Sequence, residues 1–209
     1  MYLSKLTLNT SSLEARRLLL SPYMLHKAIF RAFPDAGDGG PGRILYRLDE
    51  IMEANGDQAC LLVQSEKEPR WEKAELLVSC LTGYESKPLA LEFIPGQVFY
   101  FRLRANPTVK RNGKRLGLLN EEVQLNWLKR KAQDAGFTIL GCNVIPEGMV
   151  KDDKRKDADT SFKMTLLSIR FEGKLKVTDS QLFGKALEQG IGSAKGFGFG
   201  LLSIAPLRG

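Results

Sequence analysis

The stretch at residues 190–200 reads GIGSAKGFGFG and is followed directly by LLSIAP. It places five glycines, one lysine and two phenylalanines within eleven residues. Glycine has no Cβ and adopts positive φ without steric cost, so a backbone of this composition approaches a ligand closely. Successive free N–H groups in such a turn form a concave site for anions, above all for phosphate groups. The candidate phosphate ligands here are Gly190, Gly192, Lys195, Gly196 and Gly198.

The glycine run, as we call residues 190–200, fits neither of the common nucleotide-binding motifs. The GxGxxG pattern fails because Lys195 occupies the position of its last glycine, and no GK[ST] follows as a phosphate-binding loop requires. A glycine-rich turn that merely closes the last strand is the alternative interpretation. These residues alone leave both interpretations open.

The charge of the chain is unevenly distributed. Residues 1–97 contain 11 Lys and Arg against 13 Asp and Glu, a net charge of −2. Residues 98–209 contain 20 against 11, a net charge of +9. The second half therefore carries the whole basic excess, which predicts a polyanionic partner bound mainly there. A solvated basic face without a partner is the alternative.

The composition is that of a folded globular protein. Apolar residues make up 43% of the 209 residues and charged residues 26%, and this length suffices for one large or two small domains with a buried core. No apolar run is long enough to span a membrane, and residues 1–10 lack the apolar region of a secretion signal. The cysteines are scattered and odd in number, which favours a reducing cytoplasmic compartment; they are Cys60, Cys80 and Cys142.

The first half predicts the element order β-α-β-β-α-β, which is typical of the ferredoxin-like fold. Residues 2–8 alternate apolar and polar side chains and indicate a strand, and Ser21-Pro22 marks a helix start with Ser as cap and Pro in the first position. The helix then carries an apolar stripe. The remaining elements are expected as strands at 43–48 and 59–64 with a turn at Asn55-Gly56, a short helix at 71–77 and a strand at 88–93.

Pro95-Gly96 predicts a boundary between two domains, residues 1–94 and residues 95–209. Beyond it the same order of elements recurs. We expect strands at 98–104, 137–144, 166–177 and 201–205, and helices at 121–135 and 180–189. The predicted fold class is therefore α+β, with two tandem ferredoxin-like (RRM-like) βαββαβ domains. The charged segment at 151–159 is expected to be a hairpin tip or a disordered loop.

His26 is the only histidine, and it falls on the flank of the predicted apolar stripe with Tyr23 and Phe30 on the same side. Imidazole titrates near neutrality, so it takes a proton from one oxygen and gives one to another. Tyr23, one turn earlier, offers a hydroxyl that orients a nucleophile or a phosphate. A single histidine beside an apolar stripe is more often a core or boundary residue, and that alternative stays open.

Two groups of basic residues in the second half are candidate phosphate ligands, which give affinity rather than sequence readout. Arg102 and Arg104 alternate with apolar residues, so both face one side of their strand. The second group lies in a predicted loop around Asn112-Gly113 and consists of Lys110, Arg111, Lys114 and Arg115. A solvated basic face is again the alternative.

The inventory of metal ligands disfavours a metal-dependent nuclease. One histidine and three scattered cysteines make no site of the zinc type. The acids that cluster in the charged segment are interrupted by lysines and Arg155; they are Asp152, Asp153, Asp157 and Asp159. We therefore expect no metal to be required.

The run GIGSAKGFGFGLLSIAPL resembles the glycine-rich signature of the repeat-associated CRISPR RNA endonucleases, and in particular of the CasE family, which processes crRNA in the type I-E Cascade complex. Three further stretches agree and occur in that family's order. They are MYLSKLTLN at 1–9, SPYMLHKAIF at 21–30 and FRLRANPT at 101–108. The resemblance covers both ends and the middle of the chain.

The resemblance implies an endoribonuclease that needs neither metal nor cofactor and cleaves CRISPR repeat stem-loops in precursor crRNA. In that family the substrate's own 2′-OH attacks, leaving a 2′,3′-cyclic phosphate, and the protein keeps the crRNA among the other Cascade subunits. The family's catalytic histidine and tyrosine fall on His26 and Tyr23. A basic hairpin that contacts the stem-loop falls on Lys151, Lys154, Arg155 and Lys156, where four acids leave individual contacts open. The alternative is a non-catalytic RNA-binding scaffold of the same superfamily.

Overall fold

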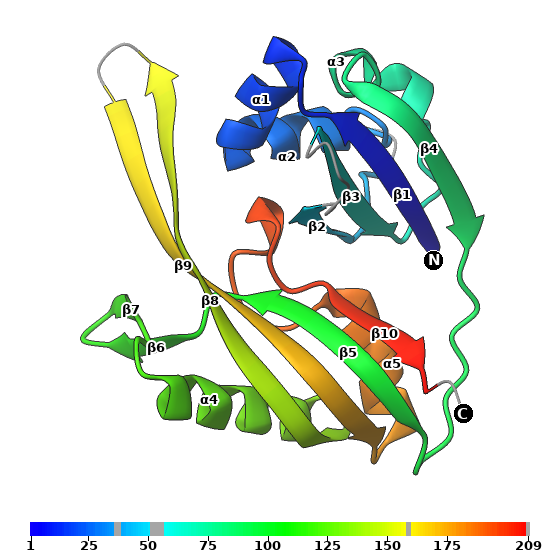
Figure 1. The fold of residues 1–209 in the computed structure, drawn as a ribbon, viewed down its shortest axis with the longest axis vertical. Helices are drawn as coiled ribbons and strands as arrows, with labels where there is room; N and C mark the ends of the chain where they lie inside the picture. Colours follow the sequence, from blue (N-terminus) through cyan, green and yellow to red (C-terminus); the bar gives the residue numbers. More distant parts are fainter. Residues whose placement is uncertain (36–38, 51–56, 158–159, 208–209) are drawn as a thin grey trace. The chain divides into compact units, whose positions relative to one another are not determined.

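The chain forms two units in the computed structural model, which describes residues 1–35, 39–50, 57–157 and 160–207 (Figure 1). One unit contains Met1–Ala90 with Lys151–Met164 and Gly196–Gly198, and the other contains Leu91–Val150, Thr165–Lys195 and Phe199–Gly209. Whether residues 1–94 and 95–209 fold as separate domains stays a prediction. Within the described ranges, no helix is both long enough and apolar enough to cross a membrane.

The first unit contains a four-stranded antiparallel sheet in the order β2-β3-β1-β4. Its strands are β1 (Tyr2–Asn9), β2 (Ile44–Glu50), β3 (Gln58–Ser65) and β4 (Leu81–Pro88). The alternation predicted for β1 is confirmed, since Leu6 and Leu8 are fully buried and Lys5 beside them is exposed. The strand order is that of the ferredoxin-like fold.

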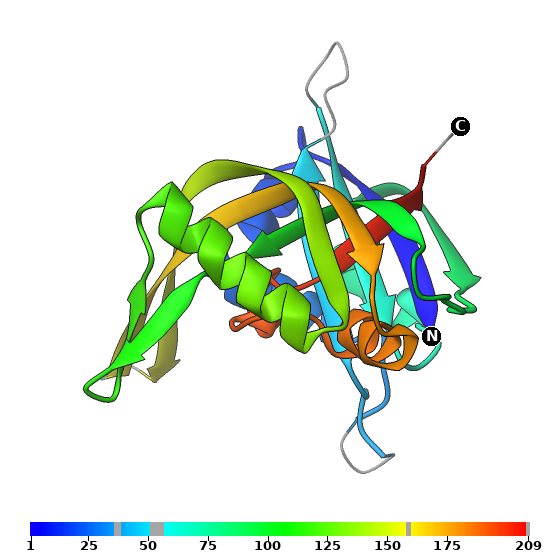
Figure 2. The ribbon, with the colours of Figure 1, turned by 90° about the horizontal axis from the view of Figure 1, so that it is seen from below.

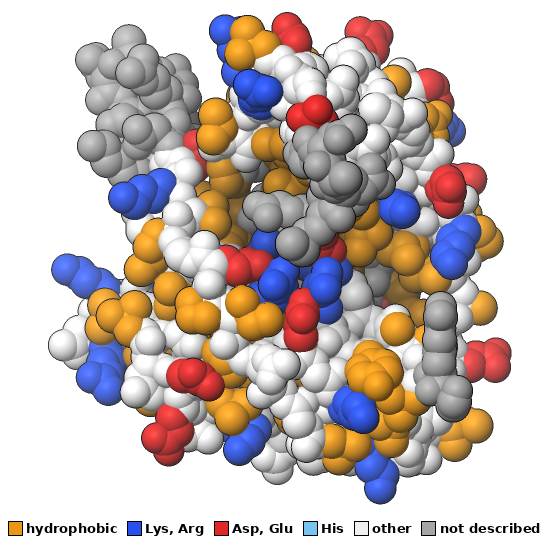
Figure 3. Space-filling model, in the orientation of Figure 1, with side chains coloured by type: hydrophobic (Ala, Val, Ile, Leu, Met, Phe, Trp, Pro, Cys, Tyr) orange, Lys and Arg blue, Asp and Glu red, His pale blue; other side chains and the backbone are white. Residues whose placement is uncertain are grey.

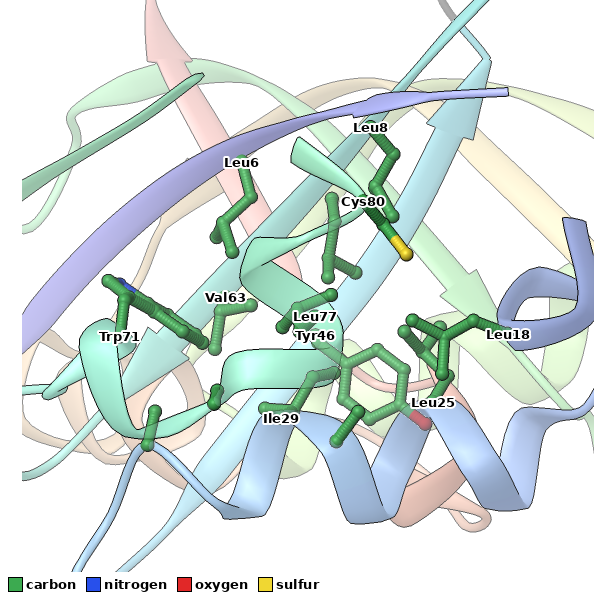
Figure 4. Packing of buried hydrophobic residues seen from close by; sticks show 14 of the residues in the cluster. Leu6, Leu8, Leu18, Leu25, Ile29, Tyr46, Val63, Trp71, Leu77 and Cys80 are labelled. Carbon is green, nitrogen blue, oxygen red and sulfur yellow. The ribbon is translucent and has the colours of Figure 1, made fainter. Parts of the chain in front are cut away.

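Helices cover one face of this sheet and close its core. They are α1 (Leu13–Leu20), α2 (Pro22–Phe30), a 3₁₀ turn η2 (Trp71–Lys73) and α3 (Glu75–Val78). Helix α2 begins as predicted, because the Ser21 side chain accepts a hydrogen bond from the Met24 N–H and Pro22 occupies the first turn. In Figure 4 the α2 side chains Leu25 and Ile29 point toward strand residues such as Val63.

The second unit repeats the pattern with a sheet in the order β10-β5-β9-β8. Its strands are β5 (Val98–Ala105), β8 (Phe137–Asp157), β9 (Thr160–Val177) and β10 (Leu202–Pro206), and its helices are α4 (Glu121–Asp134) and α5 (Ser180–Gln189). Figure 2 shows α4 running along one face of this sheet. The core between helices and sheet includes Trp127, Phe171 and Phe183. The prediction of two tandem ferredoxin-like folds is confirmed.

Two predictions about individual elements were wrong, and one helix was missed. Residues 88–93 do not form the last strand of the first half, because β4 ends at Pro88. After Leu81 every residue of this edge strand is exposed, so it lacks an apolar pattern. The loop around Asn112-Gly113 is instead a hairpin of β6 (Thr108–Arg111) and β7 (Lys114–Gly117), whose turn has φ values of 48° and 77°. Helix α1 was not predicted.

The charged segment at 151–157 is the end of strand β8, which pairs with β9 in the sheet, so its described part is a strand rather than a loop. Residues 158–159 lie outside the described residues, as does the predicted Asn55-Gly56 turn.

Candidate active site

His26 lies half-buried on α2, and a glycine backbone passes beside its ring. A Cβ added to Gly196 would stand 3.4 Å from the His26 Cε1 atom and 3.5 Å from Nδ1. The imidazole also packs on Phe30, with ring centroids 4.0 Å apart, and lies 6.4 Å from the Phe197 ring. The predicted place on the flank of the stripe is therefore confirmed, because Leu25 and Ile29 of the same helix are buried.

The Tyr46 hydroxyl fixes the glycine run beside this imidazole. Tyr46 comes from β2 and is 2% exposed. Its hydroxyl donates a hydrogen bond to the Gly196 carbonyl at 2.8 Å and lies 3.4 Å from the Pro22 carbonyl at the start of α2. Burial raises the pKa of Tyr46 strongly, and the negative charge of Asp152 raises it further. The phenol therefore stays protonated and remains a donor at neutral pH.

The Asp152 carboxylate binds the first turn of α2. It accepts a hydrogen bond from the Tyr23 backbone N–H at 2.7 Å and lies 3.1 and 3.2 Å from the Ser21 hydroxyl. A carboxylate is stabilised at this position by the positive end of the helix dipole. Asp152 thus anchors the turn that carries Tyr23, over whose ring the Lys27 Nζ lies at 5.6 Å.

The structure gives Asp152 a different role from that of a metal ligand, for which the acids of the charged segment were weighed above. Asp152 is engaged with the helix, and the side chains of Asp153, Asp157 and Asp159 lie outside the described residues. Within the described part of the chain, no group of three His, Cys, Asp or Glu is placed to hold a metal ion.

The glycines of the run are required by contacts inside the protein. Gly190, Gly192, Gly198 and Gly200 all have positive φ, between 73° and 88°. A Cβ on Gly192 would lie 3.2 Å from the Trp127 ring, and one on Gly198 would lie 3.3 Å from the Tyr46 ring. The run therefore lies close to aromatic side chains of the protein itself, and its close approach to a phosphate stays a prediction.

Arg102 and Arg104 both point away from the core, as their alternation predicted, but each is engaged by a glutamate. Arg104 makes a bidentate pair with Glu147 at 2.5 and 2.9 Å, and Arg102 approaches Glu172 at 2.6 Å. Burial raises the pKa of Glu147, but the hydrogen bond and charge of Arg104 outweigh it and leave that pKa below its usual value. An RNA phosphate would compete with these carboxylates, so RNA binding by the two arginines stays a prediction. Figure 3 shows Lys and Arg side chains beside Asp and Glu on the face drawn.

The other basic residues predicted to bind phosphate lie on the β6–β7 hairpin, in the glycine run and at the end of β8. The basic residues of the β6–β7 hairpin are all exposed; they are Lys110, Arg111, Lys114 and Arg115. Lys195, at the start of the 3₁₀ turn η3 (Lys195–Phe197), donates a hydrogen bond to the Gln189 carbonyl at 2.6 Å. Lys151 is exposed, whereas the side chains of Lys154, Arg155 and Lys156 lie outside the described residues.

The positioning roles of Tyr46 and Asp152 were not predicted from the sequence. Tyr46 lies on an alternating strand, where an inward tyrosine is typical of an ordinary core. Asp152 lies in a segment of mixed charge, and its hydrogen-bond partner on α2, Tyr23, is 129 residues away. A buried tyrosine hydroxyl needs a hydrogen-bond partner, and this is the one signal that could have pointed to Tyr46.

Comparison with known proteins identifies the family. The sequence model described as CRISPR associated protein matches residues 1–206. The CRISPR-associated endoribonuclease Cse3 of Thermus thermophilus is 33% identical over 215 residues, covering 99% of this chain and 100% of that protein. The CRISPR system Cascade subunit CasE of Escherichia coli K12 is 30% identical over 223 residues, with 99% and 100% covered.

A solved structure supports the same relationship. It is Thermus thermophilus Cse3 bound to an RNA representing a pre-cleavage complex, which matches this chain with a TM-score of 0.83 and 32% identity, covering 98% of each chain. The match extends over both ferredoxin-like folds. The chain therefore belongs to the CRISPR-associated protein family and, within it, to the CasE family.

Proposed function

We propose that this protein is an endoribonuclease that cuts CRISPR repeat stem-loops in precursor crRNA and retains the crRNA, in the cytoplasm, among the other Cascade subunits. Both curated relatives support this function, one as an endoribonuclease and one as a Cascade subunit. The observation that carries the assignment in this chain is the placement of its single histidine. His26 lies against the Gly196 backbone, with Tyr23 one turn earlier on the same helix.

In the proposed mechanism the nucleophile belongs to the RNA. The 2′-OH attacks the adjacent phosphorus, so an O2′–P bond forms, the P–O5′ bond breaks, and the products are a 2′,3′-cyclic phosphate and a 5′-OH. The protein needs to align these groups, move two protons and stabilise the charge on the phosphate. We assign proton transfer to His26 and the orientation of the nucleophile or phosphate to the Tyr23 hydroxyl. None of these steps requires a metal ion.

The packing around His26 suits this role because it restricts the ring on several sides. Phe30 lies against the imidazole, and the Tyr46 hydrogen bond holds Gly196 at its Cε1 edge. Asp152 holds the backbone of Tyr23 from the other end of the helix turn. The His26 ring and the backbone that carries Tyr23 are thus positioned by residues that need not touch RNA.

Replacing His26 by alanine tests this assignment. A general acid or base contributes about 10²–10⁴-fold in rate, so we expect a loss of that size in single-turnover cleavage of repeat RNA. Affinity for the RNA should stay within a few-fold, because it depends on the basic second half. Tyr23→Phe should slow cleavage less than His26→Ala does.

Two outcomes distinguish a catalytic His26 from a non-catalytic RNA-binding scaffold. A His26→Ala variant that cuts at the wild-type rate would refute the catalytic assignment. A wild-type protein that binds repeat RNA and never cuts it would instead favour the non-catalytic scaffold. Met24→Ala on the same helix is the matched control, because the Met24 side chain is 43% exposed, and its single-turnover rate at saturating RNA should remain close to that of the wild type.

A further inference from the structure

A cavity of about 520 Å³ lies at the end of α2 in the first unit. Three cationic side chains line it, together with one carboxylate and two apolar residues; they are Arg31, Arg70, Lys73, Asp35, Phe33 and Pro34. Pockets of about 300–1,000 Å³ hold small ligands, so this one has room for a nucleotide unit. It concentrates positive charge in the half of the chain whose net charge is −2.

Two stretches of the chain are held together to build this cavity. The Arg70 backbone N–H donates a hydrogen bond to the Ala32 carbonyl at 2.8 Å, which joins the start of η2 to the end of α2. The next residue, Trp71, is 2% exposed, and its ring packs edge-on against Phe33 with the centroids 6.0 Å apart. A backbone hydrogen bond and two buried rings thus fix the backbone that carries the three cations.

The cations of this cavity are available to a ligand. All three are exposed, and within the described ranges their side chains make no ion pair or hydrogen bond with another residue. Asp35 is the one carboxylate in the described lining, so three positive charges against one negative charge leave an excess of two. This arrangement contrasts with Arg102 and Arg104, each of which already contacts a glutamate.

The face of α2 that carries Tyr23 leads to this cavity. Tyr23, Lys27 and Arg31 are spaced at i, i+4 and i+8, so their side chains follow one face of the helix. The exposed Lys27 lies between the other two, with its Nζ over the Tyr23 ring at 5.6 Å. At about 1.5 Å per residue, Arg31 lies about 12 Å along the axis from Tyr23, which about four stacked nucleotides cover at about 3.4 Å each. An RNA strand whose scissile phosphate lies at Tyr23 therefore reaches the cavity within a few nucleotides.

We propose that this cavity binds the single-stranded RNA that continues beyond the scissile phosphate, on the side away from the stem-loop. Arg31, Arg70 and Lys73 contact its phosphates and contribute affinity rather than sequence readout. The stem-loop itself is bound by the basic second half, so the cavity adds a second RNA site in the first unit. The proposal rests on the proposed function, because it requires repeat RNA to be cut beside Tyr23 and His26.

Two double variants of the full chain test it, each of which removes one arginine and one lysine from the surface of the first unit. They are Arg70→Gln with Lys73→Gln, and Arg17→Gln with Lys87→Gln as the matched control, whose residues do not line the cavity. All four residues are exposed, so both variants should melt at the wild-type temperature.

The dissociation constant is measured for two RNAs over a series of salt concentrations. The short RNA is a stem-loop that ends at the scissile phosphate, and the long RNA continues the same stem-loop by about six nucleotides beyond it. The long RNA carries a 2′-deoxy nucleotide immediately 5′ of the scissile phosphate, so that its binding is measured without cleavage.

We expect the wild type and the control to bind the long RNA about tenfold more tightly than the short RNA, a gain of the size that two or three surface ion pairs give. The cavity variant should lose most of this gain, whereas its affinity for the short RNA should remain close to that of the wild type. Each phosphate contact on a single strand adds about 0.7 to the slope of log K against log salt, so in the wild type the long RNA should have the steeper slope by about 1.4–2. The cavity variant should lose most of that difference as well.

An equal gain in the cavity variant and the control would overturn this site while leaving the endoribonuclease assignment intact, as would a wild-type protein that binds both RNAs equally. Equal losses of affinity for the two RNAs in the cavity variant would show that Arg70 and Lys73 bind the stem-loop instead, and the proposal would fail. If that variant kept the gain but no longer assembled with the other Cascade subunits, the cavity would bind an acidic protein surface, and its assignment to RNA would be wrong. A wild-type protein that neither binds nor cuts repeat RNA would refute the proposed function, and this proposal with it.

Discussion

Replacing Tyr46 by phenylalanine removes one hydroxyl and leaves the ring that packs under Gly198. The lost interaction is the 2.8 Å hydrogen bond to the Gly196 carbonyl, made by a side chain that is 2% exposed. A buried hydrogen bond of this kind contributes about 0.5–1.5 kcal/mol, and its unpaired acceptor adds to the cost. We therefore expect a loss of about 1–2 kcal/mol in the free energy of unfolding. For a chain of this size that lowers Tm by about 2–8 °C.

The same substitution should slow the reaction, because Gly196 lies against the His26 ring. A misplacement of about 1 Å in a catalytic group costs about a hundredfold in rate. A glycine run that relaxes by part of that distance should reduce single-turnover cleavage by about 10–100-fold. Affinity for repeat RNA should stay within a few-fold, because Tyr46 is buried within the first unit.

The assay is single-turnover cleavage at saturating RNA, beside thermal unfolding of the same preparations. Tyr84→Phe is the matched control, since Tyr84 lies on β4 of the same unit and is 48% exposed. It should match the wild type in both measurements. If Tyr46→Phe lowered Tm but cut at the wild-type rate, the hydroxyl would serve stability alone, and our account of how the glycine run positions His26 would fail.

The contacts of Gly198, Asp152 and Glu147 lead to three further predictions. Gly198→Val should impair cleavage and stability more than Phe197→Leu, because valine is strained at φ 83° and its Cβ would lie 3.3 Å from the Tyr46 ring. Equal effects of the two substitutions in cleavage and melting assays would contradict this prediction. Asp152→Ala should slow cleavage with little change in RNA affinity. Asp152→Asn should recover part of the rate, because its amide oxygen still accepts a hydrogen bond from the Tyr23 N–H. An alanine variant that cleaves as fast as the wild type would rule out the anchoring role of Asp152. Glu147 has a folded-state pKa below its usual 4.5, so its ionised form stabilises the fold above that pH, and this stabilisation is lost as pH falls through the lowered value. In urea unfolding below pH 4.5, Glu147→Gln should therefore lose stability less steeply with falling pH than the wild type does. Equal pH dependence of stability in the two proteins would show that Glu147 does not contribute in this way.

The sequence predicted most of the fold because local signals agreed with tertiary burial. Ser21-Pro22 marked the start of α2, and α5 has the predicted bounds, Ser180–Gln189. Elements without an apolar pattern were missed. β4 is an exposed edge strand, and the β6–β7 hairpin has basic residues at its tip, so the Asn112-Gly113 turn was the only signal there.

The candidate site was only partly predictable, for a different physical reason. His26, Tyr23 and the glycine run were identified from residue chemistry and from the family resemblance. The residues that hold them came from elsewhere in the chain, since Tyr46 and Gly196 are 150 positions apart. The cationic cavity at the end of α2 was not predicted either, because its cations come from two separate stretches of the chain that the hydrogen bond between Arg70 and Ala32 joins.

Cleavage of repeat RNA that carries a single 2′-deoxy nucleotide immediately 5′ of the scissile phosphate tests the central claim most directly. If the RNA supplies the nucleophile, this substrate should bind within a few-fold of normal RNA and remain uncut at that bond. Normal RNA should be cut at an unchanged rate in excess chelator and should end in a cyclic phosphate. An enzyme that activates water on a metal ion would cut the deoxy substrate and stop in chelator. Cleavage of the deoxy RNA at that bond would contradict the mechanism proposed for His26 and Tyr23.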